Sequence, residues 1–227
     1  MHDTTPRRTF IGRLAAALAA GLLADAPARL RAQRAAGASA ADPDVDDRWL
    51  DRLTGTHRQL FDMAHPAGGV PLRQMRNFLN TYRDDYRAPE RDVNVVGTLY
   101  HDTLPLGLDD AMWAKYRLGE AIAVTDPSTK LATTRNLFAR PQAADTTAGL
   151  PTDAGVVELQ RRGALFIMCN NALNNWVGRL ASAGGGAPAD IRADLLAHML
   201  PGVVLVPAMV VAINKAQARG VTYFKAA

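Results

Sequence analysis

The residue best suited to nucleophilic chemistry in this 227-residue chain is its only cysteine, Cys169, which closes a short apolar run. Gly163 stands before the run Ala164–Met168, and the polar pair Asn170–Asn171 leads into apolar residues at helical spacing. This pattern predicts a strand, a tight turn and a helix start, with the thiol at the junction. Open α/β sheets bind their ligands at such a junction, outside the carboxyl ends of the strands.

Two interpretations of Cys169 follow from that position. The positive end of a helix dipole stabilises a thiolate, and a thiolate is a nucleophile. His101 follows a β-branched run that ends at Tyr100, so it is the candidate charge partner of a catalytic Cys169 at the same sheet edge. Alternatively, Cys169 packs as a small apolar core residue and His101 is an ordinary loop histidine. The sequence leaves both interpretations open.

Three further polar residues are expected near this edge. Asp62 and His65 follow the first expected strand and are candidate ligand-binding residues. Asn170 is a third candidate, although an asparagine here is equally suited to cap the helix that begins after Cys169. We predict no metal site, because the histidines lack close ligand spacing and no Cys-x-x-Cys exists. We predict no cofactor either, because phosphate-binding loops and a serine nucleophile elbow are absent.

Strand-like and helix-like segments alternate along the body of the chain. The expected strands are residues 57–63, 92–100, 164–168, 203–206 and 221–224. The expected helices are residues 70–82, 108–121, 155–162, 171–181, 189–200 and 208–219, the last with Val211, Ile213 and Ala216 facing inward. Alternation of this kind with right-handed crossovers predicts an α/β fold, a three-layer Rossmann-like sandwich with a mainly parallel sheet of about five strands.

Residues 124–153 interrupt this alternation with turn-forming residues. Loops longer than about 15 residues are uncommon unless they are functional or flexible. We therefore expect an excursion over the surface of a single domain that spans residues 57–227, with residues 41–56 forming an N-terminal arm.

The first forty residues have the features of an export signal. Arg7 and Arg8 are followed by Phe10 and Ile11, then by an apolar run from residue 14 to 24 and by small-residue triplets. This order is typical of a twin-arginine signal peptide and predicts a periplasmic or secreted protein. The alternatives are an amphipathic helix and a membrane anchor, but the run falls short of the ~20 residues that cross a bilayer. Cleavage near residue 26 is possible, and cleavage after residues 38–40 is preferred. We expect no stable membrane span after cleavage.

The charge of the chain argues against a polyanionic partner. The formal net charge of +4 resides in the first forty residues, which hold six arginines and two aspartates. The remaining basic and acidic side chains balance, so the body is neutral and no nucleic-acid partner is predicted. A single cysteine also excludes a disulfide within the chain.

Several motifs resemble the DsrE/DsrF-like family, whose members are related to intracellular sulfur relay. Those of the C-terminal half are residues 166–173 (FIMCNNAL), residues 200–207 (LPGVVLVP) and the stretch from Ile213 to Tyr223. Residues 113–120 and 126–136 resemble exported members of the same group. The resemblance implies an α/β fold, a homo-oligomer, and in some relatives a cysteine that carries sulfur as a persulfide, with a sulfur-donor or sulfur-acceptor protein as partner. The chain differs from the small cytoplasmic relay subunits in its signal, its long middle excursion and the sequence around its cysteine.

Two functions are therefore expected from the sequence. The first is an exported DsrE-like protein that binds or relays sulfur as a persulfide on Cys169. The alternative is a non-catalytic module for small-molecule binding or oligomeric assembly, in which Cys169 is a core residue. The exposure of the sulfur and the reach of His101 toward it are the features that discriminate between them.

Overall fold

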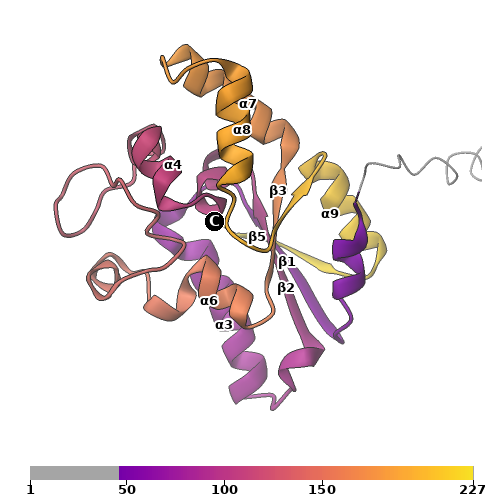
Figure 1. Ribbon diagram of the computed structural model, residues 1–227. Coiled ribbons are helices and arrows are strands. Elements are labelled where there is room, and N and C mark those ends of the chain that lie inside the picture. Colours follow the sequence, from indigo (N-terminus) through magenta and orange to yellow (C-terminus); the bar gives the residue numbers. More distant parts are fainter. Residues whose placement is uncertain (1–45, 227) are drawn as a thin grey trace, which may run out of the picture. The chain divides into compact units, whose positions relative to one another are not determined.

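The computed structural model describes residues 46–226, which form an α/β fold around one all-parallel sheet of five strands (Figure 1). The strand order is β4-β3-β2-β1-β5. The strands are β1 His57–Met63, β2 Val93–Leu99, β3 Leu165–Cys169, β4 Val203–Val206 and β5 Thr222–Ala226. The predicted Rossmann-like sandwich with a parallel sheet is confirmed.

Helices cover both faces of this sheet. The α-helices are α3 Val70–Asp84, α4 Asp110–Lys115, α5 Leu118–Ala121, α6 Val156–Arg161, α7 Asn170–Ser182, α8 Pro188–Ala197 and α9 Met209–Ala218. The 3₁₀ helices are η1 Arg48–Arg52, η2 Ala67–Gly69, η3 Glu90–Asp92, η4 His101–Gly107, η5 Ala143–Ala148 and η6 Thr152–Ala154. Apolar residues of α3 to α8 share one core cluster, whereas those of η1 and α9 belong to a second cluster.

The alternation of side chains along the strands separates these two clusters. In β1, Phe61 and Met63 belong to the cluster under α3 to α8, and Leu60 belongs to the cluster under α9. From β1 the chain forms β2, β3 and β4 successively on one side of β1. It then returns across the sheet and forms β5 on the other side of β1. A right-handed crossover that reverses direction must use the opposite face, which explains why α9 lies apart from the other helices.

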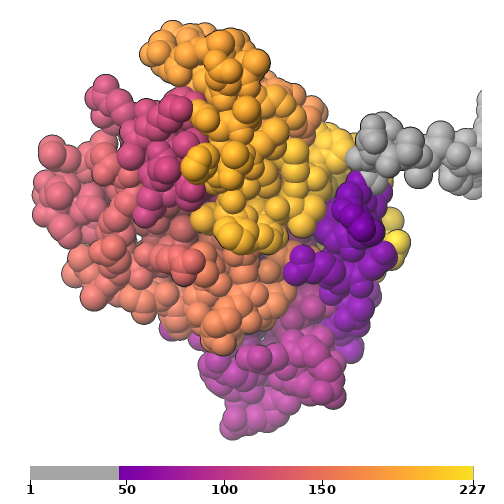
Figure 2. Space-filling model, in the orientation of Figure 1, coloured from indigo at the N-terminus to yellow at the C-terminus, as the bar shows by residue number. Residues whose placement is uncertain are grey.

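The segment before β1 packs against this second face. Trp49 and Leu50 of η1 are buried in the cluster that contains α9, and Lys215 of α9 forms an ion pair with Asp47. Figure 2 shows the indigo N-terminal residues of the described part lying against the yellow C-terminal ones. The predicted signal peptide, residues 1–40, lies outside the described residues. Within residues 46–226, none of the helices has the length and apolar character needed to cross a bilayer.

Two helices differ from their predicted form. The single helix expected over residues 108–121 is two short helices, because Arg117 between them adopts a left-handed backbone with φ of 50°. In α9 the prediction that Val211 faces inward is wrong, since this side chain is 48% exposed. Met209, Ala212 and Ala216 form the buried face instead.

The loop between α5 and α6 is anchored in the core. It holds no α-helix, as the sequence predicts, but Phe138, Ala139 and Leu150 are buried in the main cluster. The expectation of a surface excursion therefore holds only for the exposed turns of this loop, and the rest of the loop is part of the core. The side-chain amide of Asn136 donates to the carbonyl oxygens of Leu106 at 3.0 Å and Leu108 at 2.7 Å, which ties the loop to η4.

Candidate functional site

A crevice opens at the carboxyl ends of the strands, between α7 and α9. The polypeptide leaves β3 toward α7 on one face of the sheet and leaves β4 toward α9 on the other face. Such a divergence is the topological switch point at which open α/β sheets bind ligands. The crevice has a volume of about 520 Å³. Its lining residues are Asp62, Tyr100, His101, Asp102, Cys169, Asn171, Ala172, Asn175, Trp176, Arg179, Ala208, Met209, Val210 and Ile213.

Cys169 lies where the first turns of two helices meet. Its sulfur caps α7 by accepting a hydrogen bond from the Ala172 N–H at 3.5 Å, and it accepts a second from the Met209 N–H of α9 at 3.3 Å. Both donors belong to the positive ends of helix dipoles, so the sulfur occupies a position that favours negative charge. The residue is 5% exposed, and this small exposure is toward the crevice.

Asp62 forms the opposite wall of the crevice and is held by hydroxyl groups. Tyr223 donates to it at 2.6 Å and Thr98 at 3.3 Å, and Tyr100 lines the crevice beside it. The hydrogen bond to Asp62 raises the pKa of Tyr223 to about 12. Burial, followed by the influence of the Asp62 carboxyl group, raises the pKa of Tyr100 well above its usual value. Both phenols therefore remain protonated donors at neutral pH.

His101 lines the same crevice but does not hydrogen-bond the thiol. Within residues 46–226, the hydrogen bonds to the sulfur come from the two backbone amides. The His101 ring packs against Tyr100 with centroids 4.7 Å apart, and its carbonyl oxygen accepts from the Trp176 indole N–H at 2.7 Å. Its φ of 47° is left-handed, a conformation that costs a non-glycine residue about 1 kcal/mol or more and recurs at functional sites.

The structure places the other two candidate residues outside the crevice lining. His65 is exposed and pairs with Asp102 at 3.1 Å. Asn170 accepts a hydrogen bond from Arg192 of α8 at 2.8 Å, so it joins two helices. The interpretation of Asn170 as the helix cap is wrong, because the cap is the sulfur of Cys169 itself.

The sequence interpretation missed the face of α7 that looks into the crevice. Ala172, Asn175, Trp176 and Arg179 follow Cys169 at the three- and four-residue spacing of one helix face, and this spacing is the signal that identifies them. The Arg179 guanidinium stacks over the Trp176 ring at 4.1 Å. It therefore places a positive charge at the wall of the crevice.

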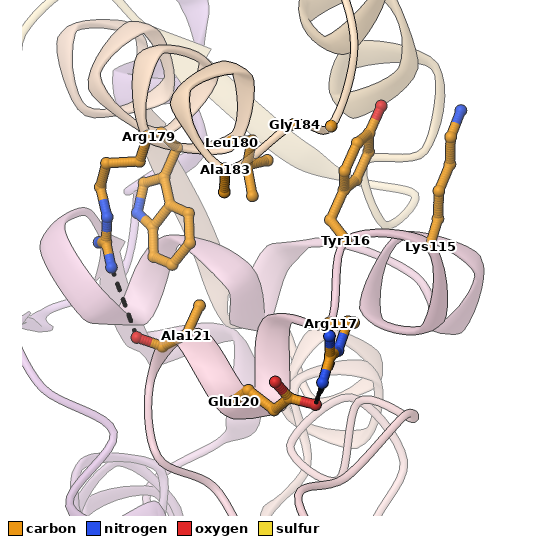
Figure 3. Close-up of a pocket in the computed structure, with 11 residues that line it drawn as sticks. Lys115, Tyr116, Arg117, Glu120, Ala121, Arg179, Leu180, Ala183 and Gly184 are labelled. Carbon is orange, nitrogen blue, oxygen red and sulfur yellow. Dashed lines mark hydrogen bonds and ion pairs between the residues drawn. The ribbon is translucent and has the colours of Figure 1, made fainter.

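A second cavity of about 480 Å³ lies on the other side of Trp176 and Arg179. Figure 3 shows Lys115 and Tyr116 on one wall and Arg179 on the opposite wall. Arg117 pairs there with Glu120 at 2.5 Å, and Arg179 donates to the Ala121 carbonyl oxygen at 3.4 Å (Figure 3). Its lining residues include no thiol, and its one lysine, Lys115, is paired with Asp194, so the crevice at Cys169 is the candidate site.

The described part of the chain has no cluster of side chains that could bind a metal ion. Residues 46–226 contain no group of three or more histidine, cysteine, aspartate or glutamate side chains placed to hold an ion.

A scan against protein-family models, a search of curated proteins and a search of solved structures each give no match to this chain.

Proposed function

We propose that this chain is an exported DsrE-like protein that binds or relays sulfur as a persulfide on Cys169. One observation carries the proposal. The sulfur accepts hydrogen bonds from the first turns of two helices while it lines a crevice at the switch point of the sheet. A core cysteine needs neither an anion-stabilising position nor an adjoining cavity.

The transfer step needs no oxidant and no cofactor. The Cys169 thiolate attacks the outer sulfur of a donor persulfide, R–S–SH, and the S–S bond of the donor breaks. The donor leaves as the thiol RSH with the proton of the persulfide, and Cys169 retains the outer sulfur as an anionic persulfide. An acceptor thiolate then removes that sulfur by the same exchange. The two amides stabilise negative charge on the Cys169 sulfur before attack, and Arg179 supplies a positive charge at the wall of the crevice in which the anionic persulfide forms.

Mass spectrometry of the intact purified protein tests the proposal. After incubation with a small-molecule persulfide and removal of excess donor, we expect the mass to rise by one sulfur atom. The gain should vanish on treatment with a reductant and be absent from the Cys169→Ser variant. A folded protein that gains no sulfur, and whose thiol is also closed to alkylation, would contradict the proposal.

A second function is favoured by the low exposure of the thiol. Cys169 is 5% exposed, and no side-chain base among residues 46–226 is hydrogen-bonded to it, so the crevice also suits a non-catalytic small-molecule site or assembly module. In that case a small molecule that binds the crevice and raises the melting temperature of the parent protein would also raise that of the Cys169→Ala variant. A persulfide carrier would lose all sulfur loading in the same variant.

Export through the twin-arginine route is part of the same proposal and is supported by the sequence of residues 1–40. We expect these residues to direct a folded reporter protein out of the cytoplasm. Replacing Arg7 and Arg8 together with lysine should abolish export, whereas the same replacement at Arg29 and Arg31 should not. Export that is unaffected by the first pair would contradict this route.

A further inference from the structure

The strand at one end of the sheet has an open edge. β5 pairs with β1 on one side, and among residues 46–226 no strand pairs with its other side. Tyr223 and Phe224 are each 42% exposed, and Thr222 and Lys225 are exposed as well. Natural sheets usually protect such edges with prolines, bulges or several charges. β5 has no proline and one charge, so it resembles an edge that is paired in the assembled protein.

An aromatic surface adjoins this edge on the face covered by α3. The Phe224 ring lies 5.5 Å from Phe61, and Phe78 and Tyr82 of α3 continue the row at 5.8 and 4.8 Å from one ring centroid to the next. Tyr86, which follows Tyr82 at 5.4 Å, is 71% exposed. Between α3 and β5, four of these rings border a groove of about 320 Å³ with polar side chains among them; the lining residues are Phe61, Phe78, Tyr82, Phe224, Gln59, Gln74, Asn77 and Thr81. Apolar surface of this kind beside an open strand favours a protein partner.

We propose that the partner is a second copy of this chain, joined by antiparallel pairing of the two β5 strands about Phe224. A two-fold axis at Phe224 sets the two Phe224 side chains opposite each other and continues the sheet to ten strands. The same axis sets Thr222 opposite Ala226 of the partner subunit. The aromatic rows of the two α3 helices then lie on the same face of the joined sheet, on either side of the seam.

In this register the single charged residue of β5, Lys225, lies opposite a polar side chain of the partner subunit. Tyr223 lies opposite Lys225 of the partner subunit, and the Tyr223 hydroxyl already donates to Asp62. Within residues 46–226, Lys225 takes part in no ion pair of its own chain. Pairing brings its ammonium group beside the partner's Tyr223, on the face where Asp62 carries its negative charge. The two-fold axis forms this contact twice.

The proposed interface also reaches the crevice. Tyr223 is both an edge residue of β5 and the closest hydroxyl donor to Asp62, which lines the crevice. Fixing Tyr223 in an interface therefore fixes one wall of the site. The inference does not depend on what the crevice binds, so it stands or falls separately from sulfur transfer.

Disulfide trapping tests the register directly. Residues opposite each other in an antiparallel pair have Cα atoms about 4.5 or 5.5 Å apart, within the range that a disulfide spans. In a Cys169→Ser background, the Phe224→Cys variant should become a covalent dimer under mild oxidation. The Leu131→Cys variant, which replaces a more exposed residue outside β5, should not. Failure of Phe224→Cys to cross-link above the level of Leu131→Cys would overturn the proposal.

The oligomeric state in solution provides the second measurement. Sedimentation equilibrium should show that the purified protein is dimeric or a multiple of a dimer. The Phe224→Lys variant, which sets two like charges opposite each other, should halve the mass, and Leu131→Lys should leave it unchanged. A monomeric parent protein, or a folded Phe224→Lys variant of undiminished mass, would also overturn it. If Phe224→Lys fails to fold, the cross-linking result decides.

Discussion

Two polar clusters inside this fold, the Arg135–Asp145 pair of the long loop and the Cys169–Asp62 crevice, differ in how their groups are satisfied. Asp145 is 1% exposed, and its carboxylate accepts two bonds from Arg135, at 2.6 and 3.0 Å, and one from the Gln142 N–H at 2.7 Å. Every strong interaction of that carboxylate therefore stays within the loop. Cys169 and Asp62 are also held by donors of the chain, but both face a cavity.

This difference separates a structural cluster from a candidate site. A buried ion pair that is fully satisfied needs no ligand, and removing one partner leaves an uncompensated charge. Groups that are fixed in place but open toward a cavity are preorganised for something that enters it. Substitutions in the loop should therefore change stability, whereas substitutions in the crevice should change chemistry at a smaller cost in stability.

The largest loss of stability is expected from Asp145→Asn. It leaves Arg135 without its main carboxylate partner and should lower the free energy of unfolding by about 3 kcal/mol, as measured by urea denaturation. Asp153→Asn is the matched control, because its ion pair with Arg76 is half exposed and should contribute at most about 1 kcal/mol. Equal effects of the two substitutions would show that the loop pair has no special structural role.

A somewhat smaller loss is expected from Asn136→Ala. This change leaves the buried carbonyl oxygens of Leu106 and Leu108 without their side-chain donor, at a cost of about 2 kcal/mol. Sulfur loading on Cys169 should be unchanged in the folded variant. A variant that loses loading while it remains folded would mean that the loop contributes to the site.

Cys169→Ala should cost about 1 to 2 kcal/mol and remove all sulfur loading. The cost arises because the Ala172 and Met209 amides lose their acceptor. Cys169→Ser keeps an acceptor at this position and should be the more stable of the two variants. If the alanine variant were the more stable one, the sulfur would be a packing residue and not an acceptor of these bonds.

The smallest effect is expected in the alkaline titration of Tyr223. Its pKa in the folded protein is about 12, against an ordinary value of about 10. The folded state thus holds this proton more tightly, so its contribution to stability is complete below about pH 10 and is lost as the pH rises toward 12. In Asp62→Asn the ultraviolet absorbance of tyrosinate should appear at lower pH than in the parent. Comparison with Tyr223→Phe identifies the transition, and an unshifted titration would contradict the Asp62 contact.

Much of the fold follows from local patterns in the sequence. The bounds of β1 and β4 agree with the predicted strands residue for residue, because the turn-forming residues around each strand are short-range signals. In α9 the prediction for Val211 is wrong, whereas that for Ala216 is right, because the first five residues of the helix, Met209 to Ile213, are all apolar and do not mark an inner face. Valine at 211 and alanine at 212 cannot be ranked until the packing against the sheet is known.

The site was predictable only in part, for a related reason. Asp62, His101 and Cys169 each lie at or near the end of a strand, which is a local property of the sequence. All three line the same crevice. The second hydrogen bond to its sulfur comes from Met209, forty residues further along the chain, and depends on β4 lying beside β3. No local pattern reveals such a contact, and the same is true of Asn170, whose partner Arg192 lies on another helix.

The reactivity of Cys169 in the native state tests the central claim most directly. The rate at which a small alkylating reagent labels the thiol should be compared between the parent protein and Asp145→Asn, without denaturant. If the thiol reacts through the crevice, the two rates should be equal, because the substitution leaves the crevice intact. If labelling requires global unfolding, the loss of about 3 kcal/mol should accelerate it roughly 100-fold, and that result would contradict an accessible nucleophile at this site.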